Sequence, residues 1–148
     1  MQQAYNDFGA WIRRRFPFRV QKISVDAGFS CPNRDGKISR GGCTFCDNHT
    51  FNPSYCNSCK SITEQLGEGK AFFARKYPDM KYLAYFQAYS NTYAPVPRLK
   101  QLYEEALSDE DVVGIVIGTR PDCLSPEILD YLEELNRRTF VIVELGVE

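Results

Sequence analysis

The chain has 148 residues, of which 43% are hydrophobic and 25% are charged, and its formal net charge is -1 at pH 7. This balance predicts one soluble globular domain with enough apolar material for a core, and it excludes a polybasic arm or a disordered tail. No apolar stretch approaches the roughly 20 residues that cross a bilayer, and the first residues lack the pattern of an export signal. We therefore expect a cytoplasmic protein without membrane attachment, whose six cysteines serve metal or redox chemistry.

A helix and a strand are predicted before the first cysteine. Apolar residues recur at helical spacing over residues 2–16, where three arginines at the end suit the helix dipole. Alternating residues over 20–25 predict a strand, which the sequence Asp26-Ala-Gly28 ends. The first cysteine follows at once, so we expect the cysteines at the carboxyl end of a strand.

The rest of the chain predicts strands and helices in alternation. Strand starts near residues 82, 112 and 140 repeat at the roughly 30-residue period of βα units, which indicates a parallel α/β sheet wound in the barrel sense. A capping box at Ser61-Ile-Thr-Glu64 begins the helix of the first unit, and Ser125 followed by Pro126 begins the helix of the last. The elements predicted after residue 60 are a helix over 62–77, a strand over 82–86, a helix over 97–107, a strand over 112–118, a helix over 126–138 and a strand over 140–143.

Three cysteines in a loop rich in Gly, Pro, Asn and Asp indicate a metal centre. Cys31, Cys43 and Cys46 follow the spacing C-x11-C-x2-C. Three thiolates satisfy three irons of a 4Fe-4S cluster and leave the fourth iron open, much as catalytic zinc sites keep a position for a reactant. The long first gap does not forbid a cluster, because closing a loop three times longer costs only about 1 kcal/mol of extra entropy.

With Phe45 just before the last cysteine, this loop resembles the signature of radical S-adenosylmethionine (SAM) proteins. The wide gap between the first two cysteines narrows the resemblance to one group within this family, and so do two later segments, Gly118-Thr-Arg-Pro-Asp122 and Glu144-Leu-Gly146. It is similar to the radical half of the elongator catalytic subunit and to the uncharacterised bacterial radical SAM proteins related to it. The resemblance to the bacterial group covers essentially the whole chain, through residues 25–36, 86–94 and 117–123.

The resemblance implies a fold, a reaction and partners. It implies a single core domain over residues 1–148, the N-terminal part of a partial (βα)6 radical SAM barrel, with about four parallel strands present and the last strands missing. It implies an enzyme in which a 4Fe-4S cluster cleaves SAM reductively to a 5'-deoxyadenosyl radical, with electrons from a donor such as flavodoxin or ferredoxin. It makes tRNA the leading substrate, and basic residues at 13–15, 34, 37 and 40 are compatible with a phosphate-bearing partner, although a net charge of -1 gives no strong electrostatic argument.

Polar residues follow all four predicted strands, where the active sites of βα barrels gather. The resemblance places a contact to the methionine amino group after the second strand, although the usual Gly-Gly-Glu is absent. Arg120 can clamp a carboxylate with two hydrogen bonds, and Glu144 can bind ribose hydroxyls or an amino group; the alternative for each is a solvated loop or a structural ion pair. The candidate cofactor contacts are Phe45, Gln87, Asn91, Thr92, Arg120 and Glu144.

A zinc site is the alternative function. Cys43, Cys46, Cys56 and Cys59 form two C-x2-C pairs, which would suit a four-thiolate zinc module that contacts RNA or protein without catalysis. This alternative leaves Cys31 and the polar strand ends unexplained. If the cluster is present, Cys56 and Cys59 are either an accessory metal or redox pair or peripheral thiols. We expect Cys123 to be buried or near the site, and His49 is too isolated for a catalytic role.

Overall fold

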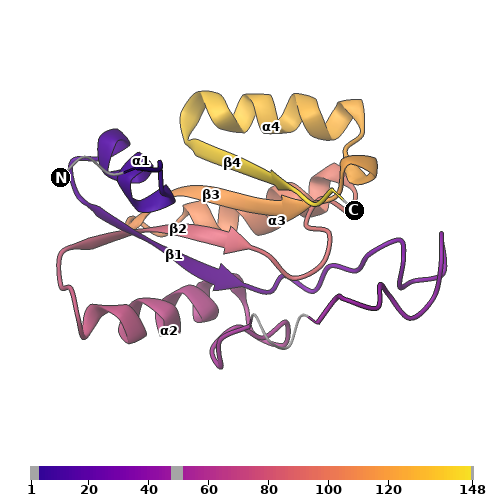
Figure 1. Ribbon diagram of the computed structural model, residues 1–148, viewed down its shortest axis with the longest axis horizontal. Helices are drawn as coiled ribbons and strands as arrows, with labels where there is room; N and C mark the ends of the chain where they lie inside the picture. Colours follow the sequence, from indigo (N-terminus) through magenta and orange to yellow (C-terminus); the bar gives the residue numbers. More distant parts are fainter. Residues whose placement is uncertain (1–3, 48–51, 148) are drawn as a thin grey trace.

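The chain folds into a four-stranded parallel sheet with α-helices on both faces (Figure 1). The computed structural model describes residues 4–47 and 52–147. The predicted α/β class with four parallel strands is confirmed, and the strand order is β1-β2-β3-β4. In chain order the elements are α1 (Phe8–Arg15), β1 (Arg19–Val25), α2 (Ile62–Ala74), β2 (Met80–Phe86), α3 (Val96–Leu107), β3 (Val112–Thr119), the 3-10 turn η1 (Pro121–Cys123), α4 (Pro126–Arg138) and β4 (Phe140–Leu145).

The helix ends follow their capping residues. Helix α1 begins at Phe8 rather than at residue 2, because the Asp7 side chain accepts a hydrogen bond from the backbone of Ala10 and fixes the first turn. The capping box at Ser61 and Glu64 is present in α2, as predicted. Helix α2 ends at Ala74, slightly before the predicted end. None of the helices in the described part of the chain is long and apolar enough to span a bilayer.

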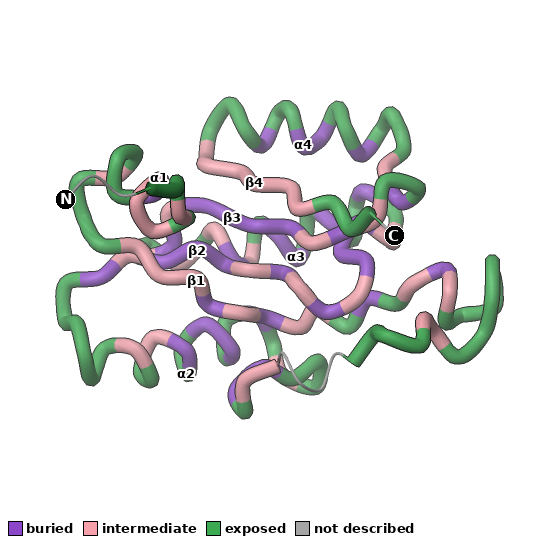
Figure 2. The backbone as a smooth tube through the Cα atoms, in the orientation of Figure 1, coloured by how far each residue is buried: buried purple, intermediate pink, exposed green. Residues whose placement is uncertain are grey.

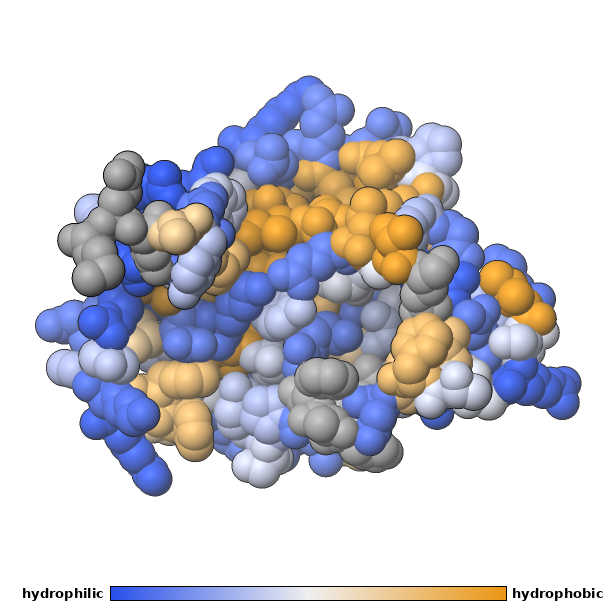
Figure 3. All heavy atoms as spheres, viewed as in Figure 1, coloured by the Kyte–Doolittle hydropathy of each residue, from blue (hydrophilic) through white to orange (hydrophobic). Residues whose placement is uncertain are grey.

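The two faces of the sheet are covered unequally. Helices α2, α3 and α4 pack on one face, which we call the outer face, and bury strand residues such as Phe86 and Ile117. Helix α1 packs on the opposite, inner face over Leu83 and Val116. Figure 2 shows that β2 and β3 are mostly buried while β4 is only partly buried, and Figure 3 shows an apolar area beside α1 on the inner face. Part of the inner face therefore stays accessible to a ligand.

The parallel register brings all four strand ends to one edge of the sheet. Val25 pairs with Phe86, Phe86 with Ile117, and Thr119 with Leu145. The loops that follow β1, β2 and β3 and the end of β4 therefore meet at this edge, as the sequence predicted. Within the described residues, β4 has a neighbouring strand on one side only.

Candidate functional site

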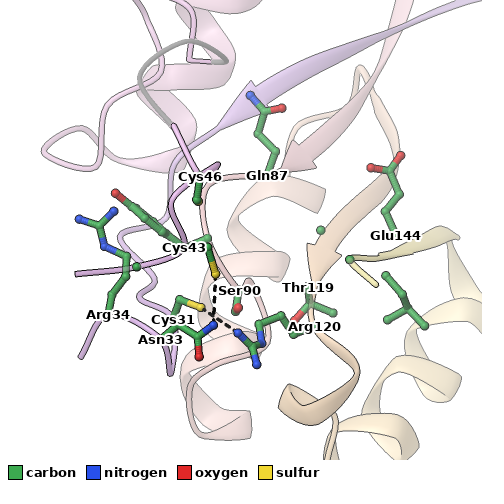
Figure 4. Close-up of a pocket in the computed structure, with 15 residues that line it drawn as sticks. Cys31, Asn33, Arg34, Cys43, Cys46, Gln87, Ser90, Thr119, Arg120 and Glu144 are labelled. Atoms are coloured by element: carbon green, nitrogen blue, oxygen red, sulfur yellow. Dashed lines mark hydrogen bonds between the residues drawn. The ribbon is translucent and has the colours of Figure 1, made fainter. Parts of the chain in front are cut away.

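A pocket of about 350 Å³ lies at the carboxyl ends of the four strands (Figure 4). Its volume falls within the range of small-molecule sites in proteins, roughly 300 to 1,000 Å³. Residues from all four strand ends line it. Of the predicted site residues, the pocket brings together Cys31, Cys43, Cys46, Gln87, Arg120 and Glu144.

The cysteine loop doubles back on itself, which brings its distant ends to the same pocket. An antiparallel bridge joins Asp35 and Arg40, and the backbone N–H of Gly42 donates to the carbonyl of Asn33 at 2.9 Å. Gly42 has a φ of 80°, a left-handed conformation that favours glycine. The eleven residues between Cys31 and Cys43 thus form a narrow excursion rather than an open loop.

The sulfurs of Cys31 and Cys43 accept hydrogen bonds from side chains that line or adjoin the pocket. Asn33 Nδ2 lies 3.2 Å from Cys43 Sγ, and Arg120 Nη1 lies 3.7 Å from Cys31 Sγ (Figure 4). The other arms of Arg120 hold Asp122, with Nε and Nη2 at 2.9 and 2.8 Å from its two carboxylate oxygens. These hydrogen bonds lower the pKa of Asp122. Arg120 thus forms the structural ion pair that the sequence left open as the alternative to a cofactor contact, with a carboxylate of its own turn.

The three cysteines have the donor type and number that an iron–sulfur cluster with one open iron takes from a protein. In the described part of the chain, no three His, Cys, Asp or Glu side chains are arranged to hold one metal ion. A 4Fe-4S cluster takes its cysteine ligands on separate irons, so it needs thiols around a larger space. Cys31, Cys43 and Cys46 line such a space, and N–H donors to the sulfurs are a recurrent feature around such clusters. By donor type, number and position, these residues fit the group.

Two predicted cofactor contacts have a structural role instead. Asn91 is fully buried, and its Nδ2 donates to the carbonyls of Ala88 and Gly118 at 3.0 and 2.9 Å. Thr92 is also buried, with Oγ1 at 2.6 Å from Thr119 Oγ1 and from the Cys123 carbonyl. Neither residue lines the pocket. We correct both assignments: their side chains join the loop after β2 to the end of β3, because they satisfy polar groups there.

Phe45 does not line the pocket either. Its side chain is 69% exposed, although the neighbouring Cys46 reaches the pocket wall. The expected cofactor contact of Phe45 is therefore not formed in this structure.

Tyr89 is a pocket residue that the sequence did not indicate. Its φ of 62° is the one left-handed value of a non-glycine residue in the described chain, and it costs on the order of 1 to 3 kcal/mol. The Arg34 guanidinium lies 4.7 Å from the centre of its ring, and both residues line the pocket. No sequence pattern indicates that a tyrosine will adopt a left-handed backbone conformation, so Tyr89 could be found only from its φ angle in the structure.

Glu144 lies at the edge of the pocket, and other strands hold its carboxylate. Lys22 Nζ lies 2.9 Å from Oε1, and the Tyr85 hydroxyl donates to Oε2 at 2.5 Å. Burial raises the pKa of Glu144, but the hydrogen bonds from Tyr85 and Lys22 outweigh it, so that the pKa is lowered overall. The side chains of Glu144 and Gln87 extend away from Cys31 and Arg120 in Figure 4. The sequence did not indicate Lys22 or Tyr85.

The second cysteine pair lies apart from the pocket. Cys56 is buried in the outer core, and burial raises the pKa of its thiol to about 12, whereas Cys59 is exposed. Cys123 is buried, as expected. His49 lies outside the described residues.

Comparisons with known proteins identify relatives without an assigned activity. No family model matches the chain, and no solved structure matches it. The chain is 44% identical to the uncharacterised protein YtqA of Bacillus subtilis over 99% of its length and 46% of YtqA. It is 42% identical to the protein YhcC of Escherichia coli K12 over 100% of its length and 47% of YhcC, and 35% identical to the uncharacterised protein MJ0486 of Methanocaldococcus jannaschii over 97% and 44%. The chain thus spans about half the length of these relatives.

Proposed function

We propose that this chain carries the cluster-binding part of a radical SAM enzyme. Cys31, Cys43 and Cys46 hold a 4Fe-4S cluster, and the pocket beside them binds SAM. One observation carries the proposal: Cys31, Cys43 and Cys46 line a single pocket at the carboxyl edge of a parallel sheet, and the sulfurs of Cys31 and Cys43 accept N–H hydrogen bonds. The three βα units and the fourth strand then form the first part of a partial (βα)6 barrel.

Each part of the pocket has a task in this proposal. When bound and reduced, the cluster supplies one electron that breaks the bond between C5' and sulfur of SAM, which leaves methionine and a 5'-deoxyadenosyl radical. Asn33 and Arg120 donate hydrogen bonds to cysteine sulfurs and so stabilise negative charge there. Gln87 and Glu144 offer an amide and a carboxylate to the ligand. An electron donor of the flavodoxin or ferredoxin class then reduces the cluster again.

RNA, and tRNA in particular, is the substrate that we propose for this reaction. Arg34 lines the pocket, and Lys37 and Arg40 are exposed on the same loop. Cations beside a pocket that also carries an aromatic ring suit a phosphate backbone with an unstacked base. Because the net charge of the chain is -1, the electrostatic argument for an RNA partner rests on the cations of this loop alone.

The proposal is tested by reconstituting the protein with iron and sulfide in the absence of oxygen. We expect about four irons for each chain and a thiolate-to-iron absorption band at about 400 nm. Cys31→Ala, Cys43→Ala and Cys46→Ala should each abolish the band. Stoichiometric zinc without iron, lost in Cys56→Ala, would instead establish the zinc module.

A further inference from the structure

Three polar side chains from three strands form a cluster on the inner face of the sheet, next to the pocket. Glu144 of β4 accepts hydrogen bonds from Lys22 of β1, at 2.9 Å, and from Tyr85 of β2, at 2.5 Å. The neighbouring inner-face residues Leu83 and Val116 are apolar and buried. The cluster lies beside these apolar side chains, and Glu144 is the member of it that lines the pocket.

Lys22 is held in place from three directions. Its ammonium lies 4.4 Å from the ring centre of Phe8 on α1, 4.4 Å from the ring centre of Tyr85, and within hydrogen-bond distance of Glu144. Aromatic faces attract a cation and limit where it can move. A lysine on a solvated strand face would otherwise sample many rotamers. The contact with α1 thus ties the helix that covers the inner face to the carboxylate at the pocket.

The carboxylate keeps acceptor capacity, because the Glu144 side chain is 40% exposed and its residue lines the pocket. An ionised carboxylate has about four acceptor sites, and Lys22 and Tyr85 use one on each oxygen. Gly118, which pairs with Glu144 on the adjacent strand, lines the same pocket and has no side chain to cover the carboxylate. A ligand with two neighbouring donors, such as a vicinal diol or a protonated amine, matches this arrangement.

We propose that Lys22 and Tyr85 are positioning residues, which hold the Glu144 carboxylate as a two-point acceptor for the donor groups of the ligand in the pocket. The identity of that ligand as SAM, through its ribose hydroxyls or its amino group, rests on the proposed function. The positioning itself rests on the contacts among the three side chains.

The contacts with Lys22 and Tyr85 also determine how Glu144 titrates, whereas an effect on ligand affinity would be absent from a purely structural ion pair. Burial alone raises the pKa of Glu144, and the two donors reverse this effect. The charged groups that line the same pocket are Arg34, which lies against Tyr89, and Arg120, which holds Asp122. Neither contacts Glu144. Removal of Lys22 and Tyr85 as donors should therefore leave burial unopposed and move the titration of Glu144 above the ordinary range of a glutamate.

The test combines Lys22→Met and Tyr85→Phe, alone and together, with Lys22→Arg as the rescue variant. Lys60→Met is the matched control, because it removes another partly exposed Lys–Glu pair, with Glu68, that lies away from the pocket. The first readout is the carboxyl ¹³C NMR titration of Glu144 in protein without cofactor. The second is the affinity of the reconstituted protein for SAM, measured by equilibrium dialysis between about pH 5.5 and 8.

We expect the titration of Glu144 to move upward by about one pH unit or more in the double variant, and SAM binding to weaken about tenfold toward the acid end. Lys22→Arg and Lys60→Met should keep both properties near wild type. Tyr85→Phe removes only a hydroxyl. It should shift the Glu144 titration and the SAM affinity in the same directions as the double variant, and it replaces that variant in the test if the double variant does not fold.

The outcomes separate the two proposals. An unchanged Glu144 titration, or a shifted titration with unchanged SAM affinity, overturns the positioning inference while the proposed function stands. A wild-type protein with about four irons that binds no SAM overturns the proposed function, and a shifted Glu144 titration would then show only that Lys22 and Tyr85 hold the carboxylate.

Discussion

Asn91 gives a sharp test of how the pocket is held together. Its side-chain amide donates to the carbonyls of Ala88 and Gly118, and through them joins the loop after β2 to the end of β3. Asn91→Ala removes both hydrogen bonds. Each contributes about 1 kcal/mol net, and the unfilled space left in a fully buried site adds about 1 kcal/mol more. We therefore expect the free energy of unfolding to fall by about 3 kcal/mol.

Asn91→Asp adds a pH dependence with a definite sign. The new carboxylate would be buried and would face carbonyl oxygens, so its pKa in the folded protein should lie well above the value of about 3.9 in the unfolded chain. A raised pKa favours the protonated form in the folded state. The destabilisation should therefore be smallest below about pH 4 and should grow as the pH rises toward the folded-state pKa. Asn91→Ala should show no such change.

Urea unfolding followed by circular dichroism at about pH 5 and pH 8 measures both effects. Gln87→Ala is the control, because Gln87 belongs to the same loop but lines the pocket; we expect a loss below about 1 kcal/mol. A loss below about 1 kcal/mol in Asn91→Ala, or an Asn91→Asp variant with the same stability at both pH values, would refute the structural role of Asn91.

Three further predictions concern the core, the sheet and the cluster. The double variant Cys56→Ser and Cys59→Ser should retain its iron content, because Cys56 packs in the outer core; a loss of half the iron would show that the pair binds metal. Gly114→Ala should destabilise the protein by about 3 kcal/mol or more in urea unfolding, since an added Cβ would lie 2.4 Å from the Phe140 carbonyl oxygen; wild-type stability would contradict this packing. Asn33→Ala removes a hydrogen bond to a cysteine sulfur, so the reduction potential from a redox titration should fall by roughly 40 mV, the equivalent of about 1 kcal/mol; an unchanged or higher potential would refute this.

The periodicity of the sequence was sufficient to predict the parallel sheet and the edge at which the pocket lies. Strand starts at a regular interval indicated βα units, and parallel strands necessarily bring their carboxyl ends together. Six predicted residues consequently line one pocket. The predicted start of α1 was wrong. Apolar residues continue at helical spacing upstream of Asp7, but the Asp7 side chain caps the helix and so sets its first residue.

The direction in which each polar side chain points could not be predicted from the sequence. Asn91 and Thr92 follow a strand as Gln87 does, but their side chains satisfy buried carbonyls and a hydroxyl rather than reach the pocket. Lys22 lies within a strand that alternates, so its contact with Glu144, 122 residues away, needs the strand order. Local patterns describe neighbours along the chain, whereas these contacts depend on neighbours across the sheet.

The central claim is that this pocket places SAM beside a cluster held by three cysteines. Its most direct test is to reduce the reconstituted protein with dithionite in the presence of SAM, without oxygen, and to measure the products. The account predicts 5'-deoxyadenosine and methionine in equal amounts, and neither product above background in Cys46→Ala. A protein with about four irons that leaves SAM intact, or a Cys46→Ala variant that forms the same products, would contradict it.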